Sequence, residues 1–230
     1  MRTIGLIGGM SWQSSKLYYE QINQLVADRL GGAHSARLIL NSMDFAPLAQ
    51  MQSDGRWREA GAMLADMAQS LERAGADVIA ISANTMHKVA QQVTASVRLP
   101  LIHIGDTLAA GLRRDGRCKP LLLGTRYTME DPFMVDHLAN KGIEAVTPDK
   151  ADRDVLHAII YDQLIKGIVT NEARTAVRAM IGRADAHEAD SVIFGCTEIG
   201  MLFPPSDAGL PGYDTLELHA RGLVDFALKD

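Results

Sequence analysis

The chain has 230 residues, of which 47% are hydrophobic and 22% are charged, and its formal net charge is −5. This composition is typical of a globular protein and excludes disordered, collagen-like and disulfide-scaffold chains. The mild acidity gives no reason to expect a nucleic-acid partner, and no apolar run approaches the ~20 residues of a membrane span. The two cysteines, Cys118 and Cys196, suit a reducing compartment, so we expect a cytoplasmic protein.

Short apolar runs alternate along the chain with longer segments of helical period. The runs predict strands buried on both faces, at residues 3–8, 37–42, 77–82, 101–104, 120–124, 144–147 and 191–195. The segments between them predict helices at residues 15–29, 56–74, 131–141, 154–166 and 171–186. In the second of these helices one apolar stripe of period 3.6 contains Ala60, Met63, Leu64, Met67 and Leu71. A last helix is predicted from Asp214, with Glu217 as the partner in a capping box.

A weak internal repeat indicates two copies of one α/β unit. The run GLIGGM resembles LLLGTRYTM, and VIAISAN resembles VIFGCTE, in the same order and at similar spacing. Alternating strands and helices predict mainly parallel sheets flanked by helices. We therefore expect two similar α/β domains, residues 1–105 and 106–213, with the helix 214–230 packing back onto the first. Ligands bind such sheets at the carboxyl ends of their strands, which predicts a site in a cleft between the domains.

Several common signatures are missing from the sequence. The glycines near the N-terminus do not have the GxGxxG spacing, and neither a phosphate-binding GxxxxGK[ST] loop nor a GxSxG nucleophile elbow occurs. The seven histidines include no HxxxH pair and have no cysteine at zinc-ligand spacing. A nucleotide-binding protein of these classes and a metal enzyme are therefore not expected.

Cys196 follows the apolar run SVIFG and precedes Thr197 and Glu198. A thiol near a helix N-terminus has a lowered pKa, because the helix dipole favours the thiolate. Such a thiolate could act as a general base or a nucleophile. The alternative is that Cys196 is a small buried hydrophobic residue without a chemical role.

The segment Asn84-Thr85-Met86-His87 follows the third predicted strand in the same way. Its polar side chains and backbone N–H groups would suit an anionic ligand such as a carboxylate, although plain N-capping explains Asn84 or Thr85 equally well. We interpret His87 as a helix-surface or packing histidine. Gln52 is either a polar loop group that reaches the site or an ordinary surface residue.

Taken together, five segments resemble the aspartate/glutamate racemases, the amino-acid racemases that use no pyridoxal phosphate. The resemblance extends over nearly the whole chain, in the family's order. The matching segments are Gly8-Gly9-Met10-Ser11-Trp12, Asn84-Thr85-Met86-His87-Lys88, Gly124-Thr125-Arg126-Tyr127-Thr128, Lys166-Gly167 and Gly195-Cys196-Thr197-Glu198.

The resemblance implies two similar α/β domains with the active site between them, no cofactor and a homodimer. It implies racemisation of aspartate, glutamate or a broader range of amino acids, by proton exchange at Cα between two opposed residues. Cys196 matches one of the two catalytic residues. The residues expected to line the substrate are Met10, Gln52, Asn84, Thr85, Met86, Thr125, Lys166, Thr197 and Glu198.

The chain departs from the family at the other catalytic position. The family has Cys, or sometimes Thr, immediately before the Asn-Thr pair, and here that residue is Ala83. Ser82 is adjacent, but in a strand its side chain should point to the opposite side. An engineered substitution, a natural single-thiol variant and a domain that only binds its ligand would each explain Ala83.

Two other functions are compatible with the sequence. The first is that of the arylmalonate decarboxylases, which are similar in fold and keep only the cysteine that matches Cys196, with a small residue opposite it. The second is that of a non-catalytic module that binds an amino acid or a dicarboxylate.

Overall fold

The computed structural model describes residues 1–185 and 189–229. The chain divides into two compact units: Met1–Ile104 with His219–Asp230 form the first, and Gly105–Leu218 form the second. The end of the predicted helix 171–186 and the last residue of the predicted helix 214–230 lie outside the described residues. Within the described part, no helix has the length and hydropathy needed to cross a membrane.

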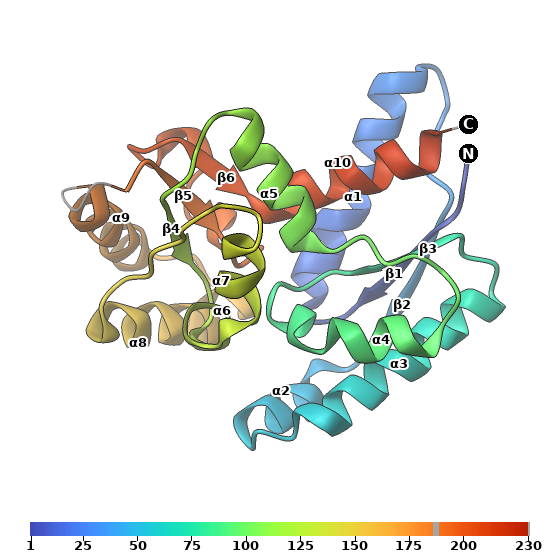
Figure 1. The fold of residues 1–230 in the computed structure, drawn as a ribbon, viewed down its shortest axis with the longest axis horizontal. Coiled ribbons are helices and arrows are strands. Elements are labelled where there is room, and N and C mark those ends of the chain that lie inside the picture. Colours follow the sequence, from blue (N-terminus) through green and yellow to red (C-terminus); the bar gives the residue numbers. More distant parts are fainter. Residues whose placement is uncertain (186–188, 230) are drawn as a thin grey trace. The chain divides into compact units, whose positions relative to one another are not determined.

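The first unit is built on a parallel sheet with the strand order β2-β1-β3. Helices α1 and α10 lie on one side of this sheet, and α3 and α4 lie on the other (Figure 1). The elements of this unit are β1 (Ile4–Gly8), α1 (Trp12–Leu30), β2 (Leu38–Ser42), α2 (Phe45–Ser53), α3 (Trp57–Arg73), β3 (Val78–Ile81), the 3-10 helix η1 (Thr85–Val89) and α4 (Ala90–Ser96). The last helix, α10 (Thr215–Leu228), begins in the second unit and continues in the first.

The second unit has its own parallel sheet, with the order β4-β5-β6. Its strands are β4 (Pro120–Leu123), β5 (Ser191–Phe194) and β6 (Gly212–Asp214), and its α-helices are α5 (Ile104–Arg114), α6 (Arg126–Glu130), α7 (Pro132–Ala139), α8 (Lys150–Ala158) and α9 (Asn171–Asp185). Helix α8 continues as the π-helical turn η2 (Ile159–Gln163) and the 3-10 helix η3 (Leu164–Lys166). Two further 3-10 turns, η4 (Ile199–Met201) and η5 (Pro205–Asp207), follow β5.

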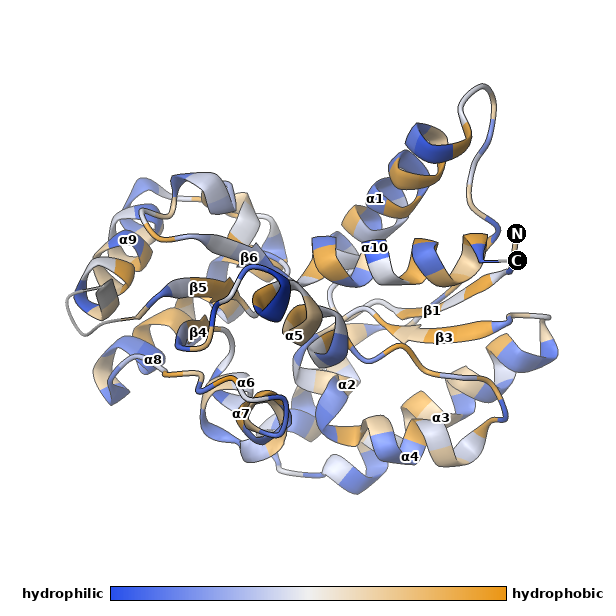
Figure 2. Ribbon diagram, turned by 45° about the horizontal axis from the view of Figure 1, so that its top comes forward, coloured by the Kyte–Doolittle hydropathy of each residue, from blue (hydrophilic) through white to orange (hydrophobic). Residues whose placement is uncertain are grey.

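Each sheet is covered by apolar helix faces, as the periodicity predicts. Along β1 and β3 hydrophobic residues predominate (Figure 2), and these strands pack on the stripe of α3, where Ala60, Leu64 and Leu71 are buried. Met63 and Met67 pack partly buried against the same cluster. In the second unit, Phe194 of β5 lies in the core with residues from α8 and α9. Burial of these apolar faces is the main force that holds each unit together.

Most predicted elements are present, and the differences have local causes. Residues 101–104 and 144–147 are not full strands: Leu101 pairs with Ile79, and Val146 pairs with Leu121, as isolated bridges. The first segment ends because α5 begins at Ile104, and the second ends before Pro148, which lacks the N–H that a continuing ladder requires. The predicted ranges include none for α2, α4, α5, α6 or β6.

Capping explains where several helices begin. The carboxylate of Asp214 accepts the N–H groups of Leu216 and Glu217, at 2.8 and 3.4 Å, so the predicted cap of α10 is confirmed. Asp149 accepts the N–H of Asp152 at 2.9 Å, which starts α8 four residues before the predicted start of that helix. Side-chain acceptors at these positions replace the partners that the first turn of a helix lacks.

Gly9, which follows β1, occupies a position that only glycine fits. Its φ is +92°, and a Cβ there would overlap the backbone of Met43. We expect Gly9→Ala to lower the free energy of unfolding by at least ~2 kcal/mol, through left-handed strain together with the steric overlap. Urea unfolding measures this loss. Gly31→Ala is the matched control, because φ is +70° there with nothing within 4 Å of the Cβ. Equal losses in the two variants would contradict the role of the overlap.

Candidate active site

Apart from Gln52 on α2 and Lys166 on η3, the candidate residues follow the carboxyl ends of the strands in each unit. In the first unit Met10 follows β1 and Ala83 follows β3, and these strands are parallel neighbours with Ile7 opposite Ile81. In the second unit Thr125 follows β4 and Cys196 follows β5, whose residues pair in parallel as well. This is the edge at which α/β sheets bind ligands. We call Met10, Gln52, Ala83, Asn84, Thr85 and Met86 the first-unit group, and Thr125, Lys166, Cys196, Thr197 and Glu198 the second-unit group.

Position 83 offers no exchangeable side-chain proton. Ala83 is 8% exposed, and its methyl group belongs to a hydrophobic cluster with Met10, Leu48 and Met86. The neighbouring Ser82 is fully buried, and its hydroxyl donates to the carbonyl oxygen of Ile7 at 2.9 Å. The hydroxyl hydrogen of Ser82 is therefore committed to the backbone, and Ser82 does not supply a free proton donor beside Ala83.

The polar members of the first-unit group are buried. Gln52 belongs to α2 and is 3% exposed, so its interpretation as a loop or surface residue is wrong, and its amide nitrogen lies 3.1 Å from the sulfur of Met86. Asn84 and Thr85 are 4% and 6% exposed at the start of η1. The side chain of Asn84 makes no capping hydrogen bond to η1, so plain N-capping does not explain this residue.

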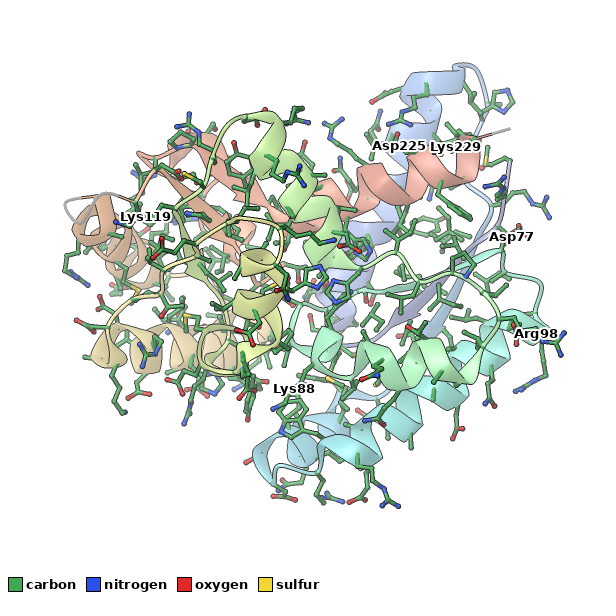
Figure 3. All side chains as sticks on the ribbon, viewed as in Figure 1. Asp77, Lys88, Arg98, Lys119, Asp225 and Lys229 are labelled. Carbon is green, nitrogen blue, oxygen red and sulfur yellow. The ribbon has the colours of Figure 1, made fainter. Side chains whose placement is uncertain are left out.

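Two further cations of the first unit, one half-buried and one exposed, are paired within that unit. Lys88, the last residue of the Asn84–Lys88 segment, places its ammonium 3.9 Å from the centroid of the Trp57 ring (Figure 3). Arg56 forms ion pairs with Asp54 and Glu59. Both cations are thus held by residues of the first unit itself.

In the second unit, Cys196 is joined to a carboxylate. Its Sγ donates to Oε2 of Glu198 at 3.1 Å, and the hydroxyl of Thr197 donates to the same oxygen at 2.7 Å. Cys196, Thr197 and Glu198 are 7%, 5% and 3% exposed. These three consecutive residues form one buried hydrogen-bonded unit.

The expected lowering of the Cys196 pKa is wrong. Burial, and then the negative charge of Glu198, raise the pKa of this thiol well above its ordinary value. The helix that follows, η4, has only three residues, which is too short for a substantial dipole. Cys196 is therefore a neutral thiol at rest, and its thiolate would be a strong base once formed.

Sequence reasoning missed two groups around this thiol. Asp214 is on β6, next to β5, and burial raises its pKa to about 6. Tyr161, in the π-helical turn η2, packs against the same hydrophobic cluster as Cys196, and burial raises its pKa. The sequence indicates only the capping role of Asp214 and not that this residue also lies next to β5. Tyr161 could not be found because a π-helical turn has no simple sequence signature.

The remaining members of the second-unit group differ in their surroundings. Thr125 is buried and caps α6, with the N–H of Thr128 donating to its hydroxyl at 3.2 Å. Lys166 is exposed at the end of η3, followed by Gly167 with φ of 76°. The structure therefore brings Cys196, Thr197 and Glu198 together and leaves Lys166 at the surface of the second unit.

No set of three or more His, Cys, Asp or Glu side chains among the described residues has the arrangement of a metal site. The chemistry that this geometry supports directly is proton transfer at a thiol. A buried thiol hydrogen-bonded to a carboxylate can lose its proton to that carboxylate and recover it, without a bulk water molecule.

Comparison with known proteins identifies the family. The sequence profile of the Asp/Glu/hydantoin racemases matches residues 7–223. The chain belongs to this family. Among related racemase structures, one from Yersinia pestis, described as that of a candidate Asp/Glu racemase, is 46% identical, covers 100% of both chains and has a TM-score of 0.91. An aspartate racemase homologue from Pyrococcus horikoshii OT3 is 32% identical, again with 100% of both chains covered, and has a TM-score of 0.86.

A curated relative within the racemases is the broad specificity amino-acid racemase RacX of Bacillus subtilis (strain 168). It is 24% identical over 162 residues, which are 69% of this chain and 68% of the relative. The predicted racemase resemblance and α/β fold class are confirmed, and the chain is assigned to the isomerases.

For this racemase chain, we expect Glu198→Gln to make Cys196 more reactive. Removing the carboxylate charge lowers the pKa of the thiol and raises the thiolate fraction, so alkylation by iodoacetamide at pH 8 should become roughly 10-fold faster. The measurement uses a Cys118→Ser background, so that only one thiol reacts. Unchanged or slower alkylation in Glu198→Gln would contradict the role given to this charge.

Proposed function

We propose that this chain is a cofactor-independent racemase scaffold for acidic amino acids, in which Cys196 exchanges the Cα proton and Ala83 occupies the second catalytic position. The observation that carries the proposal is the buried hydrogen bond from Cys196 to Glu198 at the end of β5. The matching end of β3 carries only the methyl group of Ala83. In this form the chain acts on one face of Cα.

The proposed step begins with transfer of the thiol proton from Cys196 to the carboxylate of Glu198. The thiolate then removes the Cα proton of the amino acid, and the electron pair of the C–H bond remains on the substrate as a carbanion. A complete racemase would return a proton from the opposite face. Ala83 has no proton to give, so the Cys196 thiol, after exchanging its hydrogen with solvent, returns one to the same face, and the configuration is retained. The proton on Glu198 then returns to the Cys196 thiolate.

The proposed binding of the amino-acid substrate is assigned from the polar and apolar side chains of the first-unit group and the second-unit group. Asn84 and Thr85 of the first-unit group, with Thr125 and Thr197 of the second, would bind the substrate carboxylates through hydroxyl, amide and backbone N–H donors. Glu198, which receives the thiol proton, would line the substrate beside Cys196, and Lys166 would bind the carboxylate of an acidic side chain. Met10, Gln52 and Met86 would form the less polar wall. The broad specificity named for the Bacillus relative supports testing neutral amino acids as well.

Proton NMR in deuterated buffer tests this function, with L- and D-aspartate and L- and D-glutamate as substrates. We expect the unmodified chain to replace the Cα proton of one enantiomer by deuterium without inverting it. Cys196→Ala should reduce this exchange at least ~100-fold, the scale of a general acid–base residue, whereas Cys118→Ala should leave it unchanged. Exchange that persists in Cys196→Ala would overturn the assignment, as would inversion by the unmodified chain.

The single thiol, with the small residue Ala83 at the other catalytic position, also favours a second candidate, an arylmalonate-type decarboxylase. Loss of a carboxylate there creates the carbanion, and one proton from Cys196 completes the reaction. Release of carbon dioxide from phenylmalonate, without Cα exchange on amino acids, would select this function. Stabilisation by glutamate, with neither reaction, would select a binding module.

The proposal includes a homodimeric, cytoplasmic protein, as the family resemblance implies. Both cysteines are free, which is compatible with a reducing compartment. Light scattering on the purified chain distinguishes a dimer from a monomer.

A further inference from the structure

Two side chains hold the peptide groups on either side of Ala83. The hydroxyl of Ser14, on α1, donates to the carbonyl oxygen of Ser82 at 3.0 Å. The Nδ1 atom of His87, on η1, lies 2.9 Å from the carbonyl oxygen of Ala83. Ser14 is fully buried and His87 is 4% exposed, so both bonds are shielded from water.

The contacts of His87 define its tautomer. Its Nε2 lies 3.2 Å from the backbone N–H of Ile104, which can only donate. Nε2 therefore accepts a hydrogen bond and carries no hydrogen. The single N–H hydrogen of the neutral imidazole ring is on Nδ1, which donates it to the carbonyl oxygen of Ala83. Burial, and then the neighbouring His103 and His219, keep the pKa of His87 well below its ordinary value. The ring is therefore neutral at pH 7, so Nε2 can accept from Ile104 while Nδ1 donates to Ala83.

These bonds restrict both backbone torsions of residue 83. The peptide bonds on its two sides are trans, and a trans peptide is a rigid plane. Fixing the carbonyl of Ser82 orients the plane before residue 83, and fixing the carbonyl of Ala83 orients the plane after it. The direction of the Cα–Cβ bond at residue 83 follows from these two planes.

We propose that Ser14 and His87 are positioning residues, which hold residue 83 in the orientation that proton transfer at Cα requires. The inference rests on the proposed function, since it concerns the second catalytic position of that reaction. A catalytic group displaced by about 1 Å can lose ~100-fold in rate, which gives these bonds a catalytic consequence beyond their stability.

The test separates the two hydrogen bonds of His87 in an Ala83→Cys background. Asparagine places an amide N–H near the position of Nδ1, whereas glutamine places its amide group near Nε2. We expect His87→Asn to keep kcat for glutamate racemisation within about 3-fold, and His87→Gln or Ser14→Ala to lower kcat roughly 10- to 100-fold with KM little changed. His219→Gln, a buried histidine of the same cluster, should leave kcat unchanged.

Equal losses in His87→Asn and His87→Gln, or full activity in His87→Gln, would overturn the inference. A second readout does not depend on racemisation: hydrogen–deuterium exchange of the peptide that covers residues 82–89 in the unmodified background. We expect His87→Gln to speed this exchange roughly 5- to 10-fold and His87→Asn to leave it unchanged. If the Ala83→Cys chain never racemises, the proposed function fails. The exchange experiment then tests the contact itself: exchange that is faster only in His87→Gln supports the positioning of residue 83 by Nδ1 of His87, and equal exchange in both variants overturns it.

Discussion

Ala83→Cys is expected to turn single-face proton exchange into full racemisation. The substitution supplies a second thiol at the end of β3, on the opposite face of Cα from Cys196 in the proposed reaction. A positioned general acid contributes typically 10²- to 10⁴-fold, so we expect inversion of glutamate or aspartate to exceed the uncatalysed background at least ~100-fold, whereas the unmodified chain shows no inversion above that background. Chiral chromatography of the amino acid against time measures the inversion rate.

The chain offers sharp controls for this prediction. Ser82→Cys places a thiol one residue earlier, where the present side chain is bonded to Ile7, and we expect no gain in inversion. Adding Cys196→Ala to Ala83→Cys should abolish inversion, because two opposed groups are required. A folded Ala83→Cys chain without inversion, or equal activity in Ser82→Cys, would contradict the assignment of position 83.

The added sulfur should be tolerated at residue 83. Ala83 is 8% exposed within a cluster of adaptable methionines, and overpacking of a core site costs typically 1–3 kcal/mol. The thermal unfolding midpoint of Ala83→Cys measures this cost. A loss of the folded state would leave Ala83→Thr as the variant to test, because the family also has threonine at this position.

The second large effect is a loss of stability in mild acid, caused by His219. This residue is fully buried: the hydroxyl of Tyr18 lies 2.8 Å from its Nδ1, and its Nε2 lies 2.8 Å from the carbonyl oxygen of Ile102. Burial lowers its pKa to about 4, below the value of ~6.5 in the unfolded chain. The folded chain thus binds fewer protons than the unfolded chain between these two pH values.

The sign of the effect follows from this difference. The stability contributed by neutral His219 is complete above pH ~6.5, and it is lost progressively as the pH falls toward 4. The loss amounts to about 3 kcal/mol, from a pKa difference of roughly 2.5 units at ~1.4 kcal/mol each. Below pH 4 this residue adds no further change, because both states are then protonated.

Urea unfolding at pH 7 and pH 4.5 measures this dependence. His219→Gln keeps an N–H near the position of Nε2 but cannot be protonated, so its stability should fall less between the two pH values. The difference between the two chains isolates His219, since His87, whose pKa is lowered, adds to the loss in acid and Asp214, whose pKa is raised to about 6, opposes it in both chains. An undiminished pH dependence in His219→Gln would contradict the assignment to this residue.

Much of the fold was predictable from local patterns. The apolar runs that form β1, β3, β4 and β5 are buried. A short, continuous apolar run between helices is typical of a parallel strand that is covered on both faces. The stripe of α3 and the cap at Asp214 were equally visible. Helix α2 has a weaker signal, namely Asp44 as its N-cap and Pro47 in its first turn. Helix α5 begins at Ile104, whose N–H is bound by the distant His87, and no local pattern reveals such a partner.

The residue types of the candidate site were predictable from the sequence, but the burial and the hydrogen-bond partners of those residues were not. The sequence identified Cys196, its neighbours Thr197 and Glu198, and the unusual Ala83, because strand ends and family segments are local features. Only the tertiary structure decided the direction in which the pKa of Cys196 is shifted, the burial of Gln52 and the contacts of His87. Those properties depend on burial and on hydrogen-bond partners from remote parts of the chain, such as Ile104 for His87. Electrostatic energies change steeply with such surroundings, and a linear pattern of residue types does not contain them.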